Sequence, residues 1–553
     1  MAVNVAGLVV VVLLYVGMLG VGVWAGWRGK RRKEGGREAQ PESEDFMVAG
    51  RSFNGVIGTL TMTATFVGGA FINGTAEAVY TAGSGLLWAQ APFGLALSLL
   101  IGGVFFAKKM RSAGFTTLFD PFQQKFGRFM CVLLYLPSVL SEIFYSSTIL
   151  AALGTTLSVI LKLDLRLSIL ISTSVAVLYT LLGGLYSVAY TDVLQLIFIF
   201  IGLWLCIPFA MTHQAVASIT EDTSWLGQWD NRLAAVWVDL TLMMALGSPA
   251  IQGYIQRVLA ARSAHEARLF SVFGCFGCLL LAAPPVLIGA IGASTDWNQT
   301  ALLVPPVNDT DKIAPLVIQY LTPPAVSVVG LGTVSAAVMS SVDSSILGAA
   351  SVFGRNIYKG ILRPRASERE VVWLVRLSIV NIGACAALVA LTSNTIIGLW
   401  YLSSELVYVI LLPQVVCVLF VRFSNSYGSL AGFTVGLILR IAAGEPLLNM
   451  APFVRYPFYS DELGQLFPFR TLAMLASLVS MVIISGMSHV GFIRGVLPTK
   501  LDVFHCYRNE CDLNASKMDV DMSVFSRKYN RSCDLDLTSN EVIDTEDVAN
   551  VQE

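Results

Sequence analysis

Two neighbouring hydroxyl residues in an apolar stretch are the strongest candidates for binding chemistry in this chain. In the segment SAAVMSSVDSS, residues 335–345, Ala337, Ser340 and Ser341 fall on one helical face at positions i, i+3 and i+4. Two hydroxyls and a released backbone carbonyl would supply the uncharged oxygen ligands that suit a sodium ion. Small residues at this spacing also serve helix packing in membranes, so an ion site and a packing face both remain open interpretations.

Two other apolar stretches are interrupted by residues that break helices. The segment TATFVGGAFINGTAEAVY, residues 63–80, contains three glycines and several polar groups, and GSPAIQGYIQR, residues 247–257, contains two glycines and a proline beside Gln252, Gln256 and Arg257. Glycine and proline release backbone groups from the helical ladder, which at membrane depth is tolerated only where those groups line a cavity or bind something. A pair of interrupted spans at corresponding places indicates the central site of a transporter.

Ionisable residues inside apolar segments are functional candidates because burying a charge in a membrane is costly. The sequence places seven there: Glu77, Glu142, Asp192, Asp239, Arg257, Asp343 and Glu405. Six acids against one base predict a cavity that attracts cations, either metal ions or an organic ammonium. The alternative is that Glu77, Asp192, Arg257 and Asp343 lie at helix ends or pair with backbone donors.

Composition predicts an all-α polytopic membrane protein that presents these residues. Of the 553 residues, 55% are hydrophobic and 13% are charged, and the mean hydropathy is +0.68. A span needs roughly 20 apolar residues. We therefore expect about thirteen spans, and the list of their approximate centres is 15, 67, 95, 143, 175, 202, 248, 281, 335, 382, 408, 434 and 480. The net charge of −1 says nothing about nucleic acid, since the basic residues are distributed by topology, and we expect no nucleic-acid partner.

Basic residues predict the orientation of the chain, since short cytoplasmic loops accumulate lysine and arginine. Basic clusters follow the first, third and ninth expected spans, at residues 28–37, 108–128 and 355–369. This places the N-terminus outside and the C-terminus in the cytosol. The sequons at Asn298 and Asn308 then lie outside, where glycosylation can occur.

The last part of the chain differs in character. Residues 499–553 are polar and acidic and predict a disordered cytosolic tail, with either a trafficking partner or no binding role. The four histidines lie in expected loops, near a helix end or in the tail, and no metalloprotease or serine-hydrolase motif is present. We therefore expect no enzymatic activity.

Long motifs identify a family resemblance. The run at residues 50–80, the segment GGLYSVAYTDVLQ at 183–195, AAVMSSVDSS at 336–345 and GLWYLSSELVYV at 398–409 resemble the sodium/solute symporter family, in particular its choline-transporting branch. The resemblance runs from the first span to about residue 505. It includes DPFQQ at 120–124, IGASTDWNQTA at 291–301 and KLDVF at 500–504.

The resemblance implies a LeuT-like fold with a 5+5 inverted repeat. The implied parts are a first span and basic loop (1–50), a first repeat (51–212), an extracellular loop (213–232), a second repeat (233–422), two accessory spans (423–498) and the tail (499–553). It also implies one sodium ion between the first interrupted span and residues 335–345. The implied ligands are the carbonyls of Ala64, Val67 and Ala337 and the hydroxyls of Ser340 and Ser341.

The implied substrate site differs from that of the apparent relatives. A quaternary ammonium is held by aromatic faces, indole best. Where the choline branch carries tryptophan this chain has Phe66, Tyr145 and Ile251, and where it carries tyrosine this chain has Leu95. Asp239 is retained, and the remaining candidates are Gln252 and Tyr254. The pocket can also be repacked around choline with other aromatic residues, namely Phe71, Trp400 and Tyr401.

The function that follows is sodium-coupled import of a small organic solute by alternating access, with choline as the first candidate. The resemblance implies a plasma-membrane location, synaptic or intracellular vesicles as a further one, a role in neurotransmitter biosynthesis, and a chloride requirement for which no residue is assigned. Two alternatives stay open. The chain can carry a different small solute, or it can be a sensor or leak channel that keeps the fold without coupling.

Overall fold

The computed structural model describes residues 5–34, 42–182, 184–307, 309–393 and 395–507. The chain forms two compact units, Met1–Ser485 and Gly486–Glu553. Asn308 and most of the acidic tail, residues 508–553, lie outside the described residues. Across the described part of the chain the regular structure is helical, with only isolated β-bridges between single residues. The expectation of an all-α protein is confirmed.

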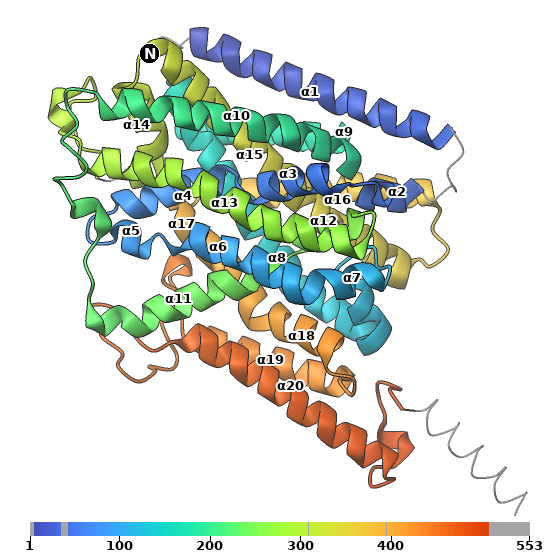
Figure 1. The fold of residues 1–553 in the computed structure, drawn as a ribbon. Helices are drawn as coiled ribbons and strands as arrows, with labels where there is room; N and C mark the ends of the chain where they lie inside the picture. Colours follow the sequence, from blue (N-terminus) through green and yellow to red (C-terminus); the bar gives the residue numbers. More distant parts are fainter. Residues whose placement is uncertain (1–4, 35–41, 183, 308, 394, 508–553) are drawn as a thin grey trace, which may run out of the picture. The chain divides into compact units, whose positions relative to one another are not determined.

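The helices of the first half of the chain begin with a long apolar rod and include the first interrupted span (Figure 1). Their bounds are α1 Val5–Glu34, α2 Glu42–Val48, α3 Gly55–Phe66, α4 Gly69–Tyr80, α5 Gly85–Trp88, α6 Gln90–Ile101, α7 Lys108–Ser112, α8 Asp120–Leu161, α9 Leu165–Leu182 and α10 Leu185–Met211.

The second half begins with the other interrupted span. Its helices are α11 Ala234–Gly247, α12 Gln252–Ala260, α13 Ala264–Ala293, α14 Ile313–Leu321, α15 Pro324–Val352, α16 Glu368–Ala390, α17 Ile396–Leu406, α18 Leu412–Phe420, α19 Ser426–Ala442 and α20 Phe469–Ile493. Short π-helical segments continue α6, α15 and α17, at Gly102–Ala107, Phe353–Leu362 and Val407–Leu411.

Ten of the described helices are long and apolar enough to cross a membrane, and the bent pair α3 and α4 makes an eleventh. Two shorter apolar helices, Leu165–Leu178 and Ser426–Ala442, occupy the remaining expected positions. Apolar side chains such as Leu13, Phe276 and Trp373 are exposed on the outer faces, at 64%, 60% and 69%. Large exposed apolar surfaces of this kind belong in lipid, which agrees with a multi-pass membrane protein.

Helix α15 forms the centre of the larger unit. Every residue from Gly330 to Val352 is buried, as expected of a helix that is surrounded by other helices on all sides. It packs against α8 and α10. It also contacts α3 and α4, on either side of the first interruption, and α12, which follows the second (Figure 1). The small residues of α15 therefore hold both broken helices against one rod.

Close packing between α10 and α15 depends on glycine. A Cβ atom added at Gly202 would lie 2.0 Å from Thr333 Oγ1, and one added at Gly330 would lie 2.3 Å from Cys206 Sγ. Contacts this short cannot be accommodated without separating the two helices. Small residues allow such close approach between membrane helices.

We predict that Gly202→Ala destabilises the protein by about 1–3 kcal/mol, the usual cost of overpacking a well-packed core. Gly20→Ala in α1 is the matched control, because a Cβ atom there has no atom within 4 Å. Thermal unfolding of the detergent-purified proteins, followed by tryptophan fluorescence, should show a lower midpoint for the first variant only. Equal midpoints for both variants would contradict the packing argument.

Candidate functional site

The first interruption lies at Val67 and Gly68, between α3 and α4. Both residues leave the helical conformation, at φ/ψ of −88°/72° and −111°/−164°, and the two helices are bent by 48°. The bend frees backbone carbonyls near the end of α3. Ser340 Oγ donates a hydrogen bond to the Ala64 carbonyl at 3.2 Å, and Ser341 Oγ donates one to the Thr65 carbonyl at 3.1 Å. Two serines of α15 thus satisfy carbonyls near this break.

Glycine at position 68 is required by this approach. A Cβ atom there would lie 1.8 Å from Ser341 Oγ, while the carbonyl oxygen of Ala337 would lie 3.5 Å from it. The break in the first span and the Ala337–Ser341 turn of α15 therefore face each other in direct contact. Four of the five residues expected at the sodium site, Ala64, Ala337, Ser340 and Ser341, meet here, and Val67 is buried at the break itself.

The second interruption lies between α11 and α12. A short 3₁₀ turn, Ser248–Ala250, is followed by Ile251 in an extended conformation, and the helix resumes at Gln252. Ser98 Oγ accepts a hydrogen bond from the Ser248 backbone N–H at 3.0 Å. The sequence prediction of two broken spans is confirmed.

Oxygen atoms dominate the cluster at the first break. Ser340 Oγ is also 2.5 Å from Asp192 Oδ1, so its single proton is shared between this carboxylate and the Ala64 carbonyl. Thr61 Oγ1 donates to the other oxygen of the carboxylate. Among the described residues, His, Cys, Asp and Glu form no group of three that could hold a metal ion. The cluster consists of carbonyl and hydroxyl oxygens beside one carboxylate, a donor set suited to a hard cation rather than a transition metal.

A buried ion pair lies beside this cluster. Arg257 Nη2 is 3.6 Å from Asp192 Oδ2, and both side chains are completely buried. Arg257 also donates to Ser344 Oγ and, at 3.3 Å, to Gln256 Oε1. The pair connects α12, which follows the second break, to α10 and α15. Asp343, a further buried acid of α15, instead accepts a hydrogen bond from the Thr180 hydroxyl of α9, at 2.5 Å.

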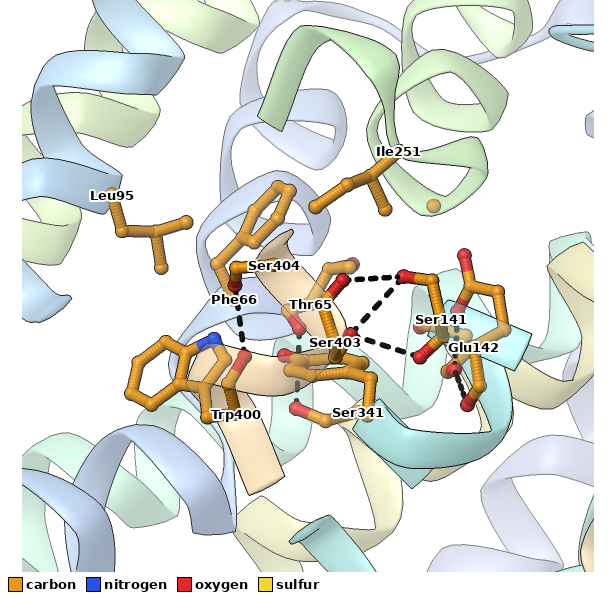
Figure 2. Close-up of a pocket in the computed structure, with 14 residues that line it drawn as sticks. Thr65, Phe66, Leu95, Ser141, Glu142, Ile251, Ser341, Trp400, Ser403 and Ser404 are labelled. Atoms are coloured by element: carbon orange, nitrogen blue, oxygen red, sulfur yellow. Dashed lines mark hydrogen bonds between the residues drawn. The ribbon is translucent and has the colours of Figure 1, made fainter. Parts of the chain in front are cut away.

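A cavity opens next to the oxygen cluster and between the two breaks (Figure 2). Its empty space is about 510 Å³, including solvent-open space. Figure 2 shows Leu95, Phe66 and Trp400 on one side of the cavity and Ser141, Ser403 and Glu142 on the other. The lining residues are Thr65, Phe66, Leu95, Ser141, Glu142, Tyr145, Ile251, Gly253, Ser341, Ser344, Ser345, Trp400, Ser403 and Ser404.

Four of the seven predicted substrate residues line this cavity: Phe66, Leu95, Tyr145 and Ile251. Trp400, one of the other aromatic candidates, also lines it. Phe71 packs on Trp400 with ring centroids 6.5 Å apart, and Tyr401 OH lies 3.5 Å from the Trp88 carbonyl, so neither belongs to the lining.

The structure does not bring the other three predicted substrate residues to the cavity. Asp239 accepts hydrogen bonds from the Thr471 backbone N–H at 2.7 Å and hydroxyl at 2.6 Å. Gln252 Oε1 accepts one from the Leu118 N–H at 2.8 Å. Tyr254 OH lies 2.8 Å from Ser271 Oγ. Each of these polar groups holds a helix in place.

The expected ratio of six acids to one base needs correction. Arg440 and Arg470 lie near helix ends, and both ion-pair with the buried Glu405. Arg470 Nη1 is also 3.5 Å from Asp239 Oδ2. The long arginine side chains reach from these helix ends to the buried acids. The negative charges of Glu405 and Asp239 are therefore balanced by arginine. Glu77 is satisfied differently, because it accepts the N–H groups of Ile396 and Ile397 at the start of α17, each at 3.2 Å.

Sequence reasoning missed most of the polar half of the cavity. Ser141 and Ser403 lie on α8 and α17 and bond to each other, and Glu142 was identified only as a buried charge. Helical spacing offered one signal: Ser141 and Glu142 precede Tyr145 by four and three residues, which puts them on the same side of a helix. Asn298 is exposed in a loop, and Asn308 lies outside the described residues.

Comparison with known proteins identifies relatives along most of the chain. Residues 46–436 match the sodium:solute symporter family. The high affinity choline transporter 1 of Homo sapiens is 50% identical over 518 residues, which cover 91% of this chain and 89% of that protein. The high-affinity choline transporter 1 of Torpedo marmorata is 51% identical over 520 residues, covering 91% of this chain and 89% of that protein.

A solved structure has the same fold. It is a substrate-bound, outward-open state of a Na⁺-coupled sialic acid symporter, with a TM-score of 0.70 at 19% sequence identity. The match covers 87% of this chain and 97% of that one. The LeuT-like sodium symporter fold expected from the sequence is confirmed.

We predict that Gly68→Ala removes the stabilising effect of sodium. The added methyl group would displace Ser341 from the break, so that the oxygen cluster could no longer close around an ion. The test is the thermal midpoint in sodium chloride minus that in N-methylglucamine chloride. Gly55→Ala, at the start of α3, is the control, because a Cβ atom there has no atom within 4 Å. A sodium-induced shift retained in Gly68→Ala would contradict the prediction.

Proposed function

Because the chain belongs to the sodium:solute symporter family, we propose that it imports a small organic cation, with choline as the first candidate, by coupling to the entry of sodium. The coupled ion would occupy the oxygen cluster at the first break, held by the Ser340 and Ser341 hydroxyls and by carbonyls of Ala64, Val67 and Ala337. The solute would occupy the neighbouring cavity.

The observation that carries this proposal is that the oxygen cluster and the cavity share residues. Ser341 hydrogen-bonds the Thr65 carbonyl in the cluster, and both residues also line the cavity. An ion bound there would fix the position of the cavity wall, and a solute in the cavity would restrain the same two residues. Binding of either one then favours the other, which is the reciprocity that coupling requires.

The choice of choline rests on the relatives and on the aromatic residues of the cavity. Two relatives that are 50% and 51% identical are choline transporters. Phe66, Tyr145 and Trp400 present three aromatic rings to the cavity, and aromatic faces attract quaternary ammonium groups. Leu95 and Ile251 contribute aliphatic surface without this attraction. These two residues favour the second candidate, a different small solute, and a sensor or leak channel is the third.

Alternating access supplies the mechanism. Helices α3, α4 and α12 meet α15 beside the two breaks, so each half-helix could tilt without breaking its own hydrogen-bond ladder. Sodium binding would join α3 to α15, and the solute would complete the contact between α8, α12 and α17. Each charge that crosses the membrane contributes about 2.3 kcal/mol per 100 mV of potential, which drives uphill uptake.

Further parts of the proposal concern location and topology. We propose a plasma-membrane transporter with its N-terminus outside, inverted repeats at 51–212 and 233–422, glycans at Asn298 and Asn308, and a cytosolic tail available to trafficking partners. The exposure of Asn298 is consistent with a glycan there. We also propose that transport requires chloride. The proposed activity is transport, without catalysis.

Ser340→Ala and Ser341→Ala should each raise the sodium concentration needed for half-maximal uptake of labelled choline. Each variant removes one hydroxyl ligand, and we expect about a tenfold increase, equivalent to 1.4 kcal/mol. Ser351→Ala, further along the same buried helix, is the control. Choline uptake that does not increase with sodium concentration would favour a leak channel. An unchanged half-maximal sodium concentration in both serine variants would refute the assigned sodium site.

Trp400→Ala should raise the KM for choline about two- to thirtyfold, the range expected for loss of one cation–π contact worth about 0.5–2 kcal/mol. Trp373→Ala is the matched control, since this tryptophan is 69% exposed on the outer face of α16. Initial rates of labelled choline uptake, corrected for surface expression, provide the measurement. An equal KM in both variants would show that Trp400 does not contact the substrate.

A further inference from the structure

We propose that Glu142 is the counter-charge for the transported ammonium, and that the site prefers amino alcohols whose nitrogen carries at least one N–H over fully quaternary choline. The inference rests on the proposed function, because it concerns the solute cavity of the proposed symporter. It goes further by assigning a residue to the cation and by naming the class of substrate.

Glu142 has one carboxylate oxygen held by the protein and one that is free to bind a ligand. Ser345 Oγ donates to Oε2 at 2.5 Å. Within the described residues Oε1 accepts no hydrogen bond, and the side chain lines the cavity. No cationic side chain lines the cavity. Arg257 interacts with Glu142 through space, but it lies outside the lining and is already paired with Asp192. A buried carboxylate with one open oxygen toward the cavity therefore calls for a positively charged ligand.

The serine and threonine hydroxyls of the lining face a ligand as hydrogen-bond acceptors. The hydroxyls of Ser141 and Ser403 each donate to the other residue's carbonyl, at 3.0 and 2.8 Å. Ser344 and Ser404 donate to carbonyls four residues earlier, at 2.8 and 2.9 Å. The three remaining serine and threonine hydroxyls also have acceptors. Thr65 donates to the Thr61 carbonyl, Ser341 to the Thr65 carbonyl and Ser345 to the Glu142 carboxylate.

Because all seven serine and threonine hydroxyl protons already have protein acceptors, the lone pairs of these seven oxygens are what remain for the ligand. The eighth hydroxyl of the lining, that of Tyr145, is not part of this set. An ammonium N–H can satisfy such lone pairs and the free Glu142 oxygen. A trimethylammonium group cannot, because its methyl groups donate no ordinary hydrogen bond. Binding choline here would therefore displace water from these acceptors without replacing its hydrogen bonds.

The cavity also has a place for the rest of such a substrate. In Figure 2 Leu95, Phe66 and Trp400 lie opposite Glu142, Ser141 and Ser403. Methyl groups on the nitrogen would rest on the aromatic and aliphatic side, while an N–H would point to the carboxylate and serine side. N,N-dimethylethanolamine, protonated at neutral pH, combines two methyl groups with one N–H and matches both sides.

The first test measures sodium-dependent uptake of labelled choline by the wild-type protein in cells and its inhibition by unlabelled analogues. N,N-dimethylethanolamine should inhibit at about one tenth of the choline concentration, the effect of one hydrogen bond to a charged group. The uncharged isostere 3,3-dimethylbutanol should not inhibit. Equal or weaker inhibition by N,N-dimethylethanolamine relative to choline would overturn the proposed preference.

The second test uses Glu142→Gln, which removes the charge and keeps the shape. We expect the affinity for N,N-dimethylethanolamine to fall at least tenfold, and the preference over choline to disappear. Glu142→Asp, which retains the charge, should keep the preference at reduced affinity and so guards against a folding defect. Glu462→Gln, on an exposed loop, is the control for carboxylate neutralisation. An unchanged preference in Glu142→Gln would refute the role of Glu142.

The two proposals fail in different ways. Absence of sodium-dependent uptake for every ammonium tested, in protein shown to reach the cell surface, would refute the proposed function and this inference together. Sodium-dependent choline uptake that is insensitive to N,N-dimethylethanolamine would refute the inference alone and leave the symporter assignment intact.

Discussion

A helix that is interrupted among apolar neighbours must find new partners for the carbonyls that leave its ladder. At the first break this requirement is met by two serines of α15, which reach the Ala64 and Thr65 carbonyls across a contact that only glycine at position 68 permits. An unsatisfied carbonyl in such a place would cost several kcal/mol. The arrangement of the broken helices around α15 follows from this need.

The same need creates a site with functional chemistry. Carbonyl and hydroxyl oxygens that satisfy one another can also surround a small cation, and here they lie beside a cavity that shares Thr65 and Ser341 with them. The cavity wall and the ion cluster are thus one piece of structure. A change at either would alter the other, which is the physical basis that we propose for coupled transport in this chain.

Buried charges in this protein are compensated by partners that come from distant parts of the chain. Asp192 faces Arg257, and Glu405 is paired with both Arg440 and Arg470. Glu77 instead accepts the first N–H groups of α17. Glu142 differs from all of these, because among the described residues its carboxylate accepts a hydrogen bond only from a serine hydroxyl, and the nearby Arg257 is already paired with Asp192. It is the one carboxylate in the cavity lining, which is why we assign it to the substrate.

The sequence by itself determined the class of protein, the helical segments, both interruptions and the family, because each depends on short-range properties such as apolar run length, backbone conformation and motif order. It also located the serine pair, since helical spacing puts Ser340 and Ser341 beside Ala337. Only the tertiary structure decided which side chains line the cavity. Ser141 and Ser403 meet across 262 residues of sequence, and Asp239, Gln252 and Tyr254 turn to other helices although their local sequence resembles a substrate site. Long-range partners are set by how helices pack against one another, and no periodicity within a single helix encodes that.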